Sequence, residues 1–387
     1  MVVEKKRLGD LLLNFDYLRK PLSSLERQSF QGEYPYYGAQ GIIDYVKEYR
    51  CDGEYLLIAE DGENLSSRNE PIAQIAIGKF WVNNHAHVVK ANSDADLRYI
   101  CYALNHSDIT GYVTGSAQPK LSQANLNKIT LNVPHLVIQR RIASILSAYD
   151  NLIENNNRRI RLLEQMAENL YKEWFVRFRF PGHEKVEFEN GLPKGWIEEV
   201  ASNVIDVMSG GTPKTEREDF YGGDIPFYTP KDANDSIFVY STITNITEEG
   251  LAHCNSQYYP VNTLMITARG TVGKLSLLAV PMAMNQSCFA LKFKDDKNPY
   301  YLYYSIKNEV SKLKKMANGG VFDTIIVKTF DHIKIIVPSE KMLEAFDKDA
   351  TPILEQIQQL QRQSISLSRQ RDLLLPRLMS GKLEVKV

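Results

Sequence analysis

Hydrophobic residues follow two different periods along this chain. Two short stretches alternate apolar and polar residues and end in proline: Ile129, Leu131, Val133 and Pro134 in the first, and Ile333, Ile335, Val337 and Pro338 in the second. A period of two predicts a β-strand. After each proline, apolar residues recur three and four positions apart for roughly ten turns without a glycine, which predicts a helix far longer than average.

The two stretches belong to an internal repeat. Residues 115–134 align without a gap on residues 319–338, 204 positions further along. Pro35-Tyr36-Tyr37 likewise parallels Pro226-Phe227-Tyr228, and we expect these aromatic side chains to lie in the core rather than on a base. The order is therefore globular domain, long helix, globular domain, long helix, in an α+β fold. The predicted boundaries are 1–134, 135–179, 180–338 and 339–387.

The apolar stripes of the long helices have a mean spacing of about 3.5, which is typical of a coiled-coil seam. The expected partner of each helix is the other helix, and the alternative is that each packs on a local core. Thr351-Pro352 has the form of an N-cap and first helical residue, so we expect the second helix to restart there, and Pro376 to kink or end its last turn. The predicted seam residues are Leu146, Tyr149, Ile153, Ile160, Leu163, Leu170, Ile353, Ile357, Leu360, Leu367 and Leu374.

Composition adds limits rather than a function. A chain of 387 residues usually forms two or more domains. Lys plus Arg number 46 against 47 Asp plus Glu, so any surface that attracts nucleic acid must be local. The apolar run near the start is broken by Asn14 and Asp16, too short and too polar for a signal peptide or membrane span. We therefore expect a cytoplasmic protein.

Motifs that would indicate chemistry are incomplete. Asn298-Pro299-Tyr300-Tyr301 lacks the second proline of the adenine methyltransferase motif and reads better as a turn before a helix. Residues 270–274 are one position too short for a phosphate-binding loop, and Leu275 replaces its Ser or Thr. His85 and His87 have no further metal ligands nearby in sequence. We therefore expect no catalytic residue and no metal site.

Several polar loops have the composition of a DNA-binding surface. Residues 209–215 (SGGTPKT) offer hydroxyls, an ammonium and backbone amides that we expect to be unhindered, the groups that bind phosphates. Amide side chains can pair with adenine, and Arg269 with guanine. The alternative for each loop is an ordinary solvated turn. The predicted DNA-binding residues are Ser116, Gln118, Lys120, Gly210, Gly211, Thr212, Lys214, Lys231, Arg269, Lys274, Asn285 and Gln286.

Over nearly its whole length the sequence resembles the specificity subunits of type I restriction-modification enzymes. The resemblance rests on residues 209–215, on 268–274 (ARGTVGK), on Asn285-Gln286 and on stretches of both long helices, of which 371–381 (RDLLLPRLMSG) is the most specific. The first domain departs from this pattern: it lacks SGGTPKT, and Asn84-His85 stands where the second domain has Asn285-Gln286.

The resemblance implies an inverted repeat with antiparallel long helices, in which each domain reads half of a gapped site in double-stranded DNA. It also implies two methyltransferase subunits and two restriction subunits as partners. These partners would bind S-adenosylmethionine, ATP and magnesium and would carry out adenine-N6 methylation and cleavage. This chain itself would hold no cofactor. The alternatives are the DNA-binding subunit of another bipartite, type II-like restriction system, and a coiled-coil scaffold that binds no DNA.

Overall fold

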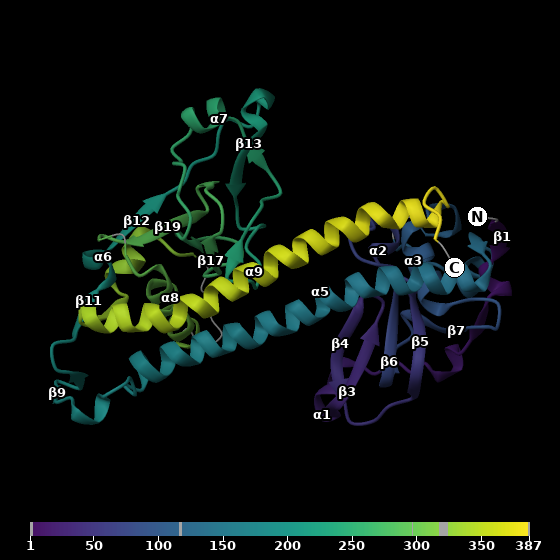
Figure 1. Ribbon diagram of the computed structural model, residues 1–387, viewed down its shortest axis with the longest axis horizontal. Coiled ribbons are helices and arrows are strands. Elements are labelled where there is room, and N and C mark those ends of the chain that lie inside the picture. The colour runs from purple at the N-terminus through teal and green to yellow at the C-terminus, as the bar shows by residue number, and fades with distance from the viewer. Residues whose placement is uncertain (1–2, 116–117, 296, 317–323, 386–387) are drawn as a thin grey trace. The chain divides into compact units, whose positions relative to one another are not determined.

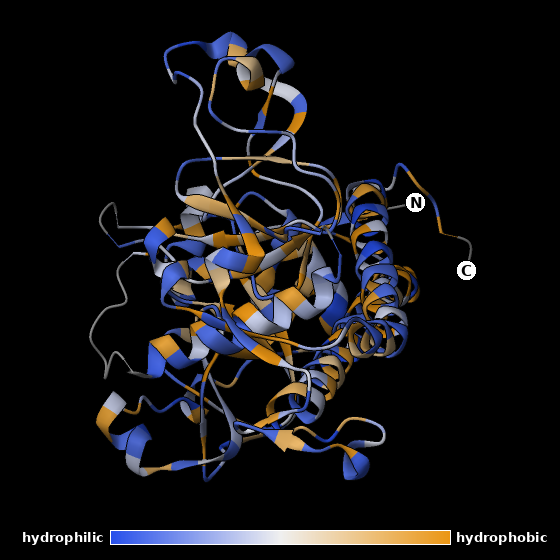
Figure 2. Cartoon of the chain, turned by 90° about the vertical axis from the view of Figure 1, so that its left-hand side faces the viewer, coloured by the Kyte–Doolittle hydropathy of each residue, from blue (hydrophilic) through white to orange (hydrophobic). Residues whose placement is uncertain are grey.

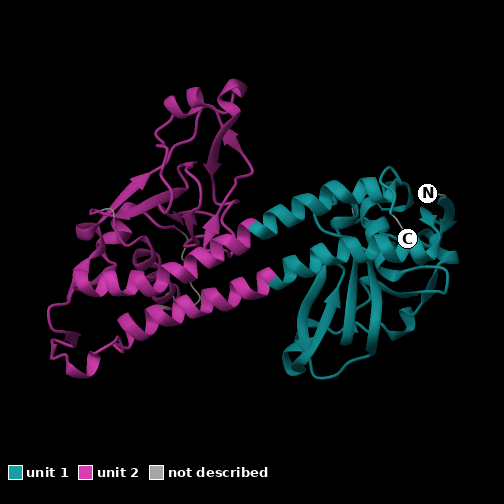
Figure 3. Cartoon of the chain, viewed as in Figure 1, with its two compact units in different colours: residues 1–155, 363–387 teal, residues 156–362 magenta. Residues whose placement is uncertain are grey.

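A computed structural model describes residues 3–115, 118–295, 297–316 and 324–385. The chain divides into two compact units, coloured separately in Figure 3. Unit 1 comprises residues 1–155 and 363–387, and unit 2 comprises residues 156–362. Each unit contains one globular part and a portion of both long helices, α5 (Leu136–Tyr171) and α9 (Glu340–Met379).

Unit 1 is built around a six-stranded sheet in the order β2-β7-β5-β6-β3-β4. Neighbouring strands are antiparallel except β3 and β6, which are parallel. A separate pair joins β1 to β8, so the strand predicted from the first alternation forms and ends at Pro134. In chain order the elements before α5 are β1 (Val3–Arg7), β2 (Leu12–Asn14), α1 (Ser24–Ser29), β3 (Gln31–Gly38), β4 (Gly41–Val46), β5 (Cys51–Ala59), α2 (Asn64–Ser67), β6 (Ala73–Val82), β7 (Ala86–Ala91), α3 (Leu97–His106), α4 (Gln123–Leu126) and β8 (Thr130–Pro134), with 3-10 turns at Leu8–Asp10, Asp16–Leu18 and Thr110–Tyr112.

Unit 2 contains a five-stranded sheet in the order β12-β19-β16-β17-β14 and a three-stranded sheet in the order β15-β13-β18. The second predicted strand forms as β20 and pairs with β11, as β8 pairs with β1 in unit 1. In chain order the elements are a π-helical turn (Lys172–Val176), β9 (Phe188–Glu189), β10 (Leu192–Pro193), β11 (Ile197–Val200), α6 (Ala201–Val204), β12 (Ile205–Ser209), β13 (Tyr221–Tyr228), β14 (Phe238–Val239), β15 (Asn245–Ile246), α7 (Glu248–Ala252), β16 (Leu264–Thr267), β17 (Leu275–Leu278), β18 (Ala283–Met284), β19 (Cys288–Phe293), α8 (Pro299–Met316) and β20 (Lys334–Val337), with 3-10 turns at His183–Lys185, Glu218–Phe220 and Val327–Asp331.

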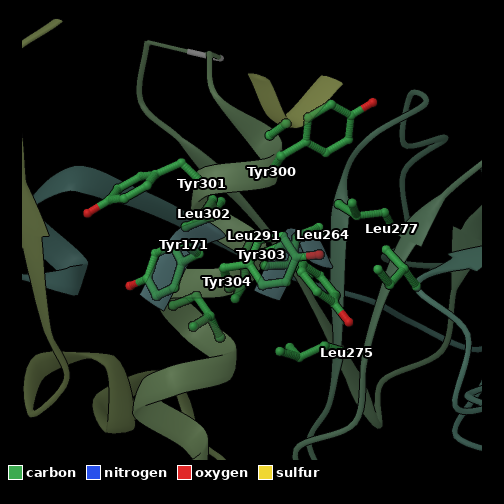
Figure 4. Packing of buried hydrophobic residues seen from close by; sticks show 14 of the residues in the cluster. Tyr171, Leu264, Leu275, Leu277, Leu291, Tyr300, Tyr301, Leu302, Tyr303 and Tyr304 are labelled. Atoms are coloured by element: carbon green, nitrogen blue, oxygen red, sulfur yellow. The ribbon is translucent and has the colours of Figure 1, made fainter. Parts of the chain in front are cut away.

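Each unit has its own hydrophobic core, and the long helices contribute to both. In unit 1, Leu146 of α5 and Leu378 of α9 share a core with Ile58 of β5 and Tyr99 of α3. The core of unit 2 is rich in aromatic rings, which Figure 4 shows around α8. There, the Tyr171 ring stacks on that of Tyr304 with centroids 5.8 Å apart. Aromatic contacts of this kind stabilise a core in addition to the stabilisation that comes from burying apolar surface.

The long helices pack on each other in opposite directions. In unit 1, the carboxylate of Asp150 accepts a hydrogen bond from Arg371 at 2.6 Å. In unit 2, the rings of Tyr171 and Phe346 lie 6.5 Å apart. Later residues of α5 therefore meet earlier residues of α9, which confirms the expected antiparallel pairing within an α+β fold. Figure 2 shows that both hydrophobic and hydrophilic residues occur along the long helices.

The predicted seam residues face inward. Ile160, Leu163, Leu170, Ile353, Ile357 and Leu360 belong to or pack against the core of unit 2, and Leu146 and Leu374 do so in unit 1. Tyr149, Ile153 and Leu367 are half-buried or better. The stripe therefore marks the packed face of each helix, although part of that face covers a globular core rather than the other helix alone.

The predicted restart of the second helix at Pro352 is wrong. α9 runs from Glu340 through Pro352 without a break and ends at Met379, within one turn after Pro376. Each proline removes one backbone hydrogen bond, to the carbonyl four residues earlier. Those carbonyls belong to Lys348 and Asp372, which are exposed, so water can replace the missing amide.

No helix within the described ranges is sufficiently long and apolar to span a membrane.

Candidate nucleic-acid interface

Three of the predicted DNA-binding segments meet at one end of the five-stranded sheet of unit 2. The end of β12 (Ser209) is paired with Phe289 near the start of β19, and the end of β16 (Thr267) with Cys288. The start of β17 is paired with the end of β16, since Leu275 lies opposite Ile266. Because β12, β19, β16 and β17 are antiparallel to their neighbours in this order, the turns beyond these strand ends lie side by side. Figure 1 labels β12, β17 and β19 in this sheet.

A fourth segment joins them through β13. The amide of Asn285 donates to the carbonyl of Tyr228, the last residue of β13, at 3.0 Å. The amide of Ala268 donates to the carbonyl of Ser287 at 2.8 Å, and the hydroxyl of Thr212 donates to the side chain of Gln286. We call residues 209–215, 228–232, 267–274 and 285–287 together the unit 2 edge.

The two glycines of SGGTPKT allow close packing rather than phosphate access. Both are buried, and the amide of Gly211 donates to the carbonyl of Met284 at 3.2 Å, so the expectation of an unhindered amide is wrong there. A Cβ added to Gly210 would lie 2.3 Å from the carbonyl oxygen of Asn285, and one added to Gly211 would lie 2.6 Å from the amide nitrogen of Asn255. Only glycine permits such a close approach of two backbone segments.

The unit 2 edge contains exposed cations. Lys214, Lys231 and Arg269 are exposed, and none of their side chains forms a hydrogen bond or ion pair with another described residue. Lys274 differs, because its ammonium contacts the exposed carboxylate of Asp235 at 2.9 Å. An exposed pair of this kind contributes little stability, so Lys274 can exchange Asp235 for another anion.

Asp232, which was not among the predicted site residues, holds the turn of Lys231. Its carboxylate accepts from the amide and hydroxyl of Thr229 at 2.8 and 2.7 Å, and from the amide of Ile243 at 2.7 Å. The carboxylate is buried, and these three bonds satisfy it. The signal that could have revealed this turn is Thr-Pro-Lys-Asp, a turn sequence in which Asp bonds back to nearby amides.

Unit 1 repeats the same hydrogen bonds. The amide of Asn83 donates to the carbonyl of Tyr37 at 3.0 Å, and the amide of His85 donates to the side-chain oxygen of Asn83 at 2.8 Å. In unit 2, Asn285 makes the same bonds to Tyr228 and from Ser287, each at 3.0 Å.

Asn83-Asn84, and not Asn84-His85, therefore corresponds to Asn285-Gln286. The match made from sequence was wrong by one residue, because two asparagines stand in succession and only the backbone pairing distinguishes them. The sequence offset of 204 is correct further along the chain. The amide of Leu121 donates to the carbonyl of Glu60 at 2.7 Å, and the amide of Ile325, 204 residues later, donates to the carbonyl of Ala268 at 3.0 Å.

The corresponding edge of unit 1 carries paired charges. We call residues 59–61, 83–85 and 118–122 the unit 1 edge. The ammonium of Lys120 lies 3.3 Å from the carboxylate of Glu60, which also accepts from Arg19 at 2.5 Å. Gln118 is exposed, whereas Ser116 lies outside the described residues. Burial alone would raise the pKa of Glu60, but the hydrogen bond from Arg19 and the charge of His87 keep that pKa below its ordinary value.

A buried histidine supports this edge from below. His87 contacts the carboxylate of Asp16 through Nδ1 at 2.7 Å and the carbonyl of Leu121 through Nε2 at 2.9 Å. The ring therefore faces two hydrogen-bond acceptors, and it donates to both only when both ring nitrogens carry a proton. Burial opposes ionisation of Asp16, but hydrogen bonds from His87 and Val88 outweigh it and lower the pKa of that carboxyl.

The residues that were weighed as possible catalytic or metal-binding groups make contacts within the fold. His85 and His87 contact different carboxylates, those of Asp61 and Asp16. No group of three or more His, Cys, Asp and Glu residues within the described part of the chain could hold a metal ion. The helix expected after Asn298-Pro299 forms as α8, which already begins at Pro299, and Tyr300 and Tyr301 are buried in the core.

Comparison with known proteins agrees with this duplicated arrangement. The family described as "Type I restriction modification DNA specificity domain" matches residues 2–165 and residues 193–369. The chain belongs to this family. Each matched range contains one of the two edges and continues into a long helix.

Several relatives extend over most of the chain. The type I restriction enzyme HindI specificity subunit of Haemophilus influenzae is 24% identical and covers 89% of this chain and 87% of its own. A putative specificity subunit of the same organism, S.HindORF215P, is 29% identical over 88% of this chain and 84% of its own. A type I restriction-modification S subunit from M. genitalium, known from a crystal structure, has a TM-score of 0.64 at 17% identity, covers 98% of this chain and 96% of its own, and so shares the fold.

Proposed function

We propose that this chain is the sequence-specific DNA-binding subunit of a type I restriction-modification complex. The unit 1 edge and the unit 2 edge would each read one half of a gapped, bipartite site. The observation that carries the proposal is that the same set of backbone hydrogen bonds gathers polar turns at one end of the sheet in both units. The membership of the family supports DNA as the ligand.

The two edges have different charges, which suits an asymmetric site. Exposed lysines and Arg269 at the unit 2 edge can bind phosphates or guanine. At the unit 1 edge, Lys120 is already paired with the carboxylate of Glu60, which Arg19 also contacts. Because the edges offer different donors and acceptors, we infer that the two half-sites differ in sequence.

We further propose that this chain carries out no chemistry. Two methyltransferase subunits and two restriction subunits would supply adenine-N6 methylation and cleavage, and would bind S-adenosylmethionine, ATP and magnesium. The complex would act in the cytoplasm. Support comes from the family of the chain and from the structural roles of the residues that resemble catalytic motifs, such as Pro299 at the start of α8.

Sequencing of methylated adenines in a host with and without this gene tests the proposal. We expect a bipartite methylated motif that depends on the gene. Methylation that does not change would contradict the proposal. A filter-binding assay with random duplexes distinguishes the alternative of a scaffold, which would retain no DNA, and neighbouring genes distinguish a type II-like system, which would have one fused nuclease-methyltransferase.

A further inference from the structure

The position of Arg269 is occupied by a carboxylate in unit 1. The backbone amide of Glu60 donates to the carbonyl of His85 at 2.9 Å, as the amide of Ala268 donates to the carbonyl of Ser287 at 2.8 Å. The next residues, Asp61 and Arg269, are therefore equivalent. A bare carboxylate at this place would repel the phosphates of DNA, so unit 1 needs another group to make the contact that Arg269 is positioned to make.

The residue facing Asp61 supplies such a group. Nδ1 of His85 lies 2.8 Å from both carboxylate oxygens of Asp61. The side chain of His85 is 47% exposed and that of Asp61 only 18%, so the imidazole is the outer member of the pair. The second ring nitrogen, Nε2, makes no hydrogen bond to any described residue, which leaves it available to a ligand.

The other charges nearby are already engaged. Lys120 and Arg19 contact Glu60 at 3.3 and 2.5 Å, and Arg19 also contacts Asp16 at 3.2 Å. The buried His87 contacts the same Asp16 at 2.7 Å and lies 3.9 Å from Glu60. The imidazole of His85 differs from Lys120 and Arg19, which both contact Glu60, because its Nε2 has no partner among the described residues and its side chain is exposed.

We propose that His85, oriented by Asp61, determines specificity in unit 1 by donating a hydrogen bond to an acceptor on the major-groove edge of a base. Guanine N7 and O6 are the acceptors that a cationic donor reads best. Unit 2 presents its donor from the turn after β16, and unit 1 presents its donor from the facing turn before β7. This inference rests on the proposed function.

Asp61 is a positioning residue in this scheme. Its contact with Nδ1 fixes the ring orientation and directs Nε2 outward. Donation from Nε2 while Nδ1 donates to Asp61 requires that both ring nitrogens carry a proton.

The test uses the full chain in complex with its methyltransferase partner, and duplexes in which each half-site position carries each of the four bases. The half-site of unit 2 is identified as the one affected by Gly210→Ala. We expect His85→Ala to reduce discrimination about 5- to 10-fold at one guanine of the other half-site. Asp61→Asn should give a smaller loss at the same position. His106→Ala, which removes an exposed histidine at the end of α3 in the same unit, is the matched control and should change nothing.

A conservative variant separates a hydrogen-bonding role from a general structural one. His85→Gln keeps an amide that can donate, so it should retain part of the preference for guanine at that position, whereas His85→Ala should lose it.

Two outcomes would overturn the inference: an unchanged motif in His85→Ala, or a uniform loss across all sequences, which indicates a phosphate contact. A wild-type complex that selects no sequence at all would refute the proposed function itself.

Discussion

Replacing Gly210 with alanine is expected to damage recognition by unit 2 without affecting unit 1. An added Cβ would lie 2.3 Å from the carbonyl oxygen of Asn285 and 2.5 Å from that of Met284. Ordinary carbon contacts begin near 3.5 Å, so the two backbone segments must separate by about 1 Å. Both obstacles are backbone atoms, which cannot rotate away. The same separation would pull Thr212 from Gln286, to which it is hydrogen-bonded.

The expected loss of stability follows from this overpacking. Forcing extra volume into a packed site costs about 1–3 kcal/mol. For a unit of this size, each kcal/mol lowers Tm by about 2–4 °C. Thermal unfolding should therefore show a lower transition for unit 2, and competition with duplexes in which one half-site is scrambled should show weaker discrimination in the half-site of unit 2 alone.

Gly111→Ala is the matched control. An added Cβ there meets no atom within 4 Å, and the residue has no positive φ. Its variant should unfold and bind like the wild type. If Gly210→Ala also kept the wild-type Tm and the wild-type discrimination, the close approach of the two segments would not matter to the unit 2 edge, and this reasoning would be refuted.

Three further predictions concern single side chains. Arg269→Ala should lose about 1–3 kcal/mol of discrimination at one position in the half-site of unit 2, measured by competition binding, whereas an equal loss for all sequences would indicate a phosphate contact. Arg371→Ala should destabilise unit 1 by about 1 kcal/mol in chemical denaturation, because Asp150 loses a half-buried partner, and Asp372→Ala, at a more exposed carboxylate, should have a smaller effect. Burial raises the pKa of Asp347 from 3.8 to about 6, so the folded state binds its proton more tightly than the unfolded state and stability falls as the pH rises from about 4 to about 6. Asp347→Asn should therefore stabilise unit 2 by about 1–2 kcal/mol at pH 7.5 and not at pH 4, and a gain that is the same at both values would contradict this.

The sequence was most informative where a pattern reflects one local interaction. The period of two before Pro134 and Pro338 identified β8 and β20, and the spacing of 3.5 identified the packed faces of α5 and α9. Tyr36, Phe227 and Tyr228 are buried, as expected of core aromatics. Each of these features depends on residues a few positions apart, which is why periodicity and residue type sufficed.

Other features depend on which strands become neighbours. The pair of His85 and Asp61 forms because Ala86 of β7 lies opposite Ala59 of β5, and no local pattern indicates that register. The same pairing decides that Asn83 rather than Asn84 corresponds to Asn285. Thr351-Pro352 suggested that the second helix restarts there, but packing of α9 outweighs the loss of one hydrogen bond at Pro352.

Selection from a pool of randomised duplexes by the reconstituted methyltransferase complex tests the central claim most directly. If both units read DNA through their edges, the enriched molecules should contain two short blocks of different sequence separated by a spacer of constant length in which no base is preferred. Gly210→Ala should weaken one block and His85→Ala the other. A single continuous block, or enrichment that neither variant alters, would contradict the account.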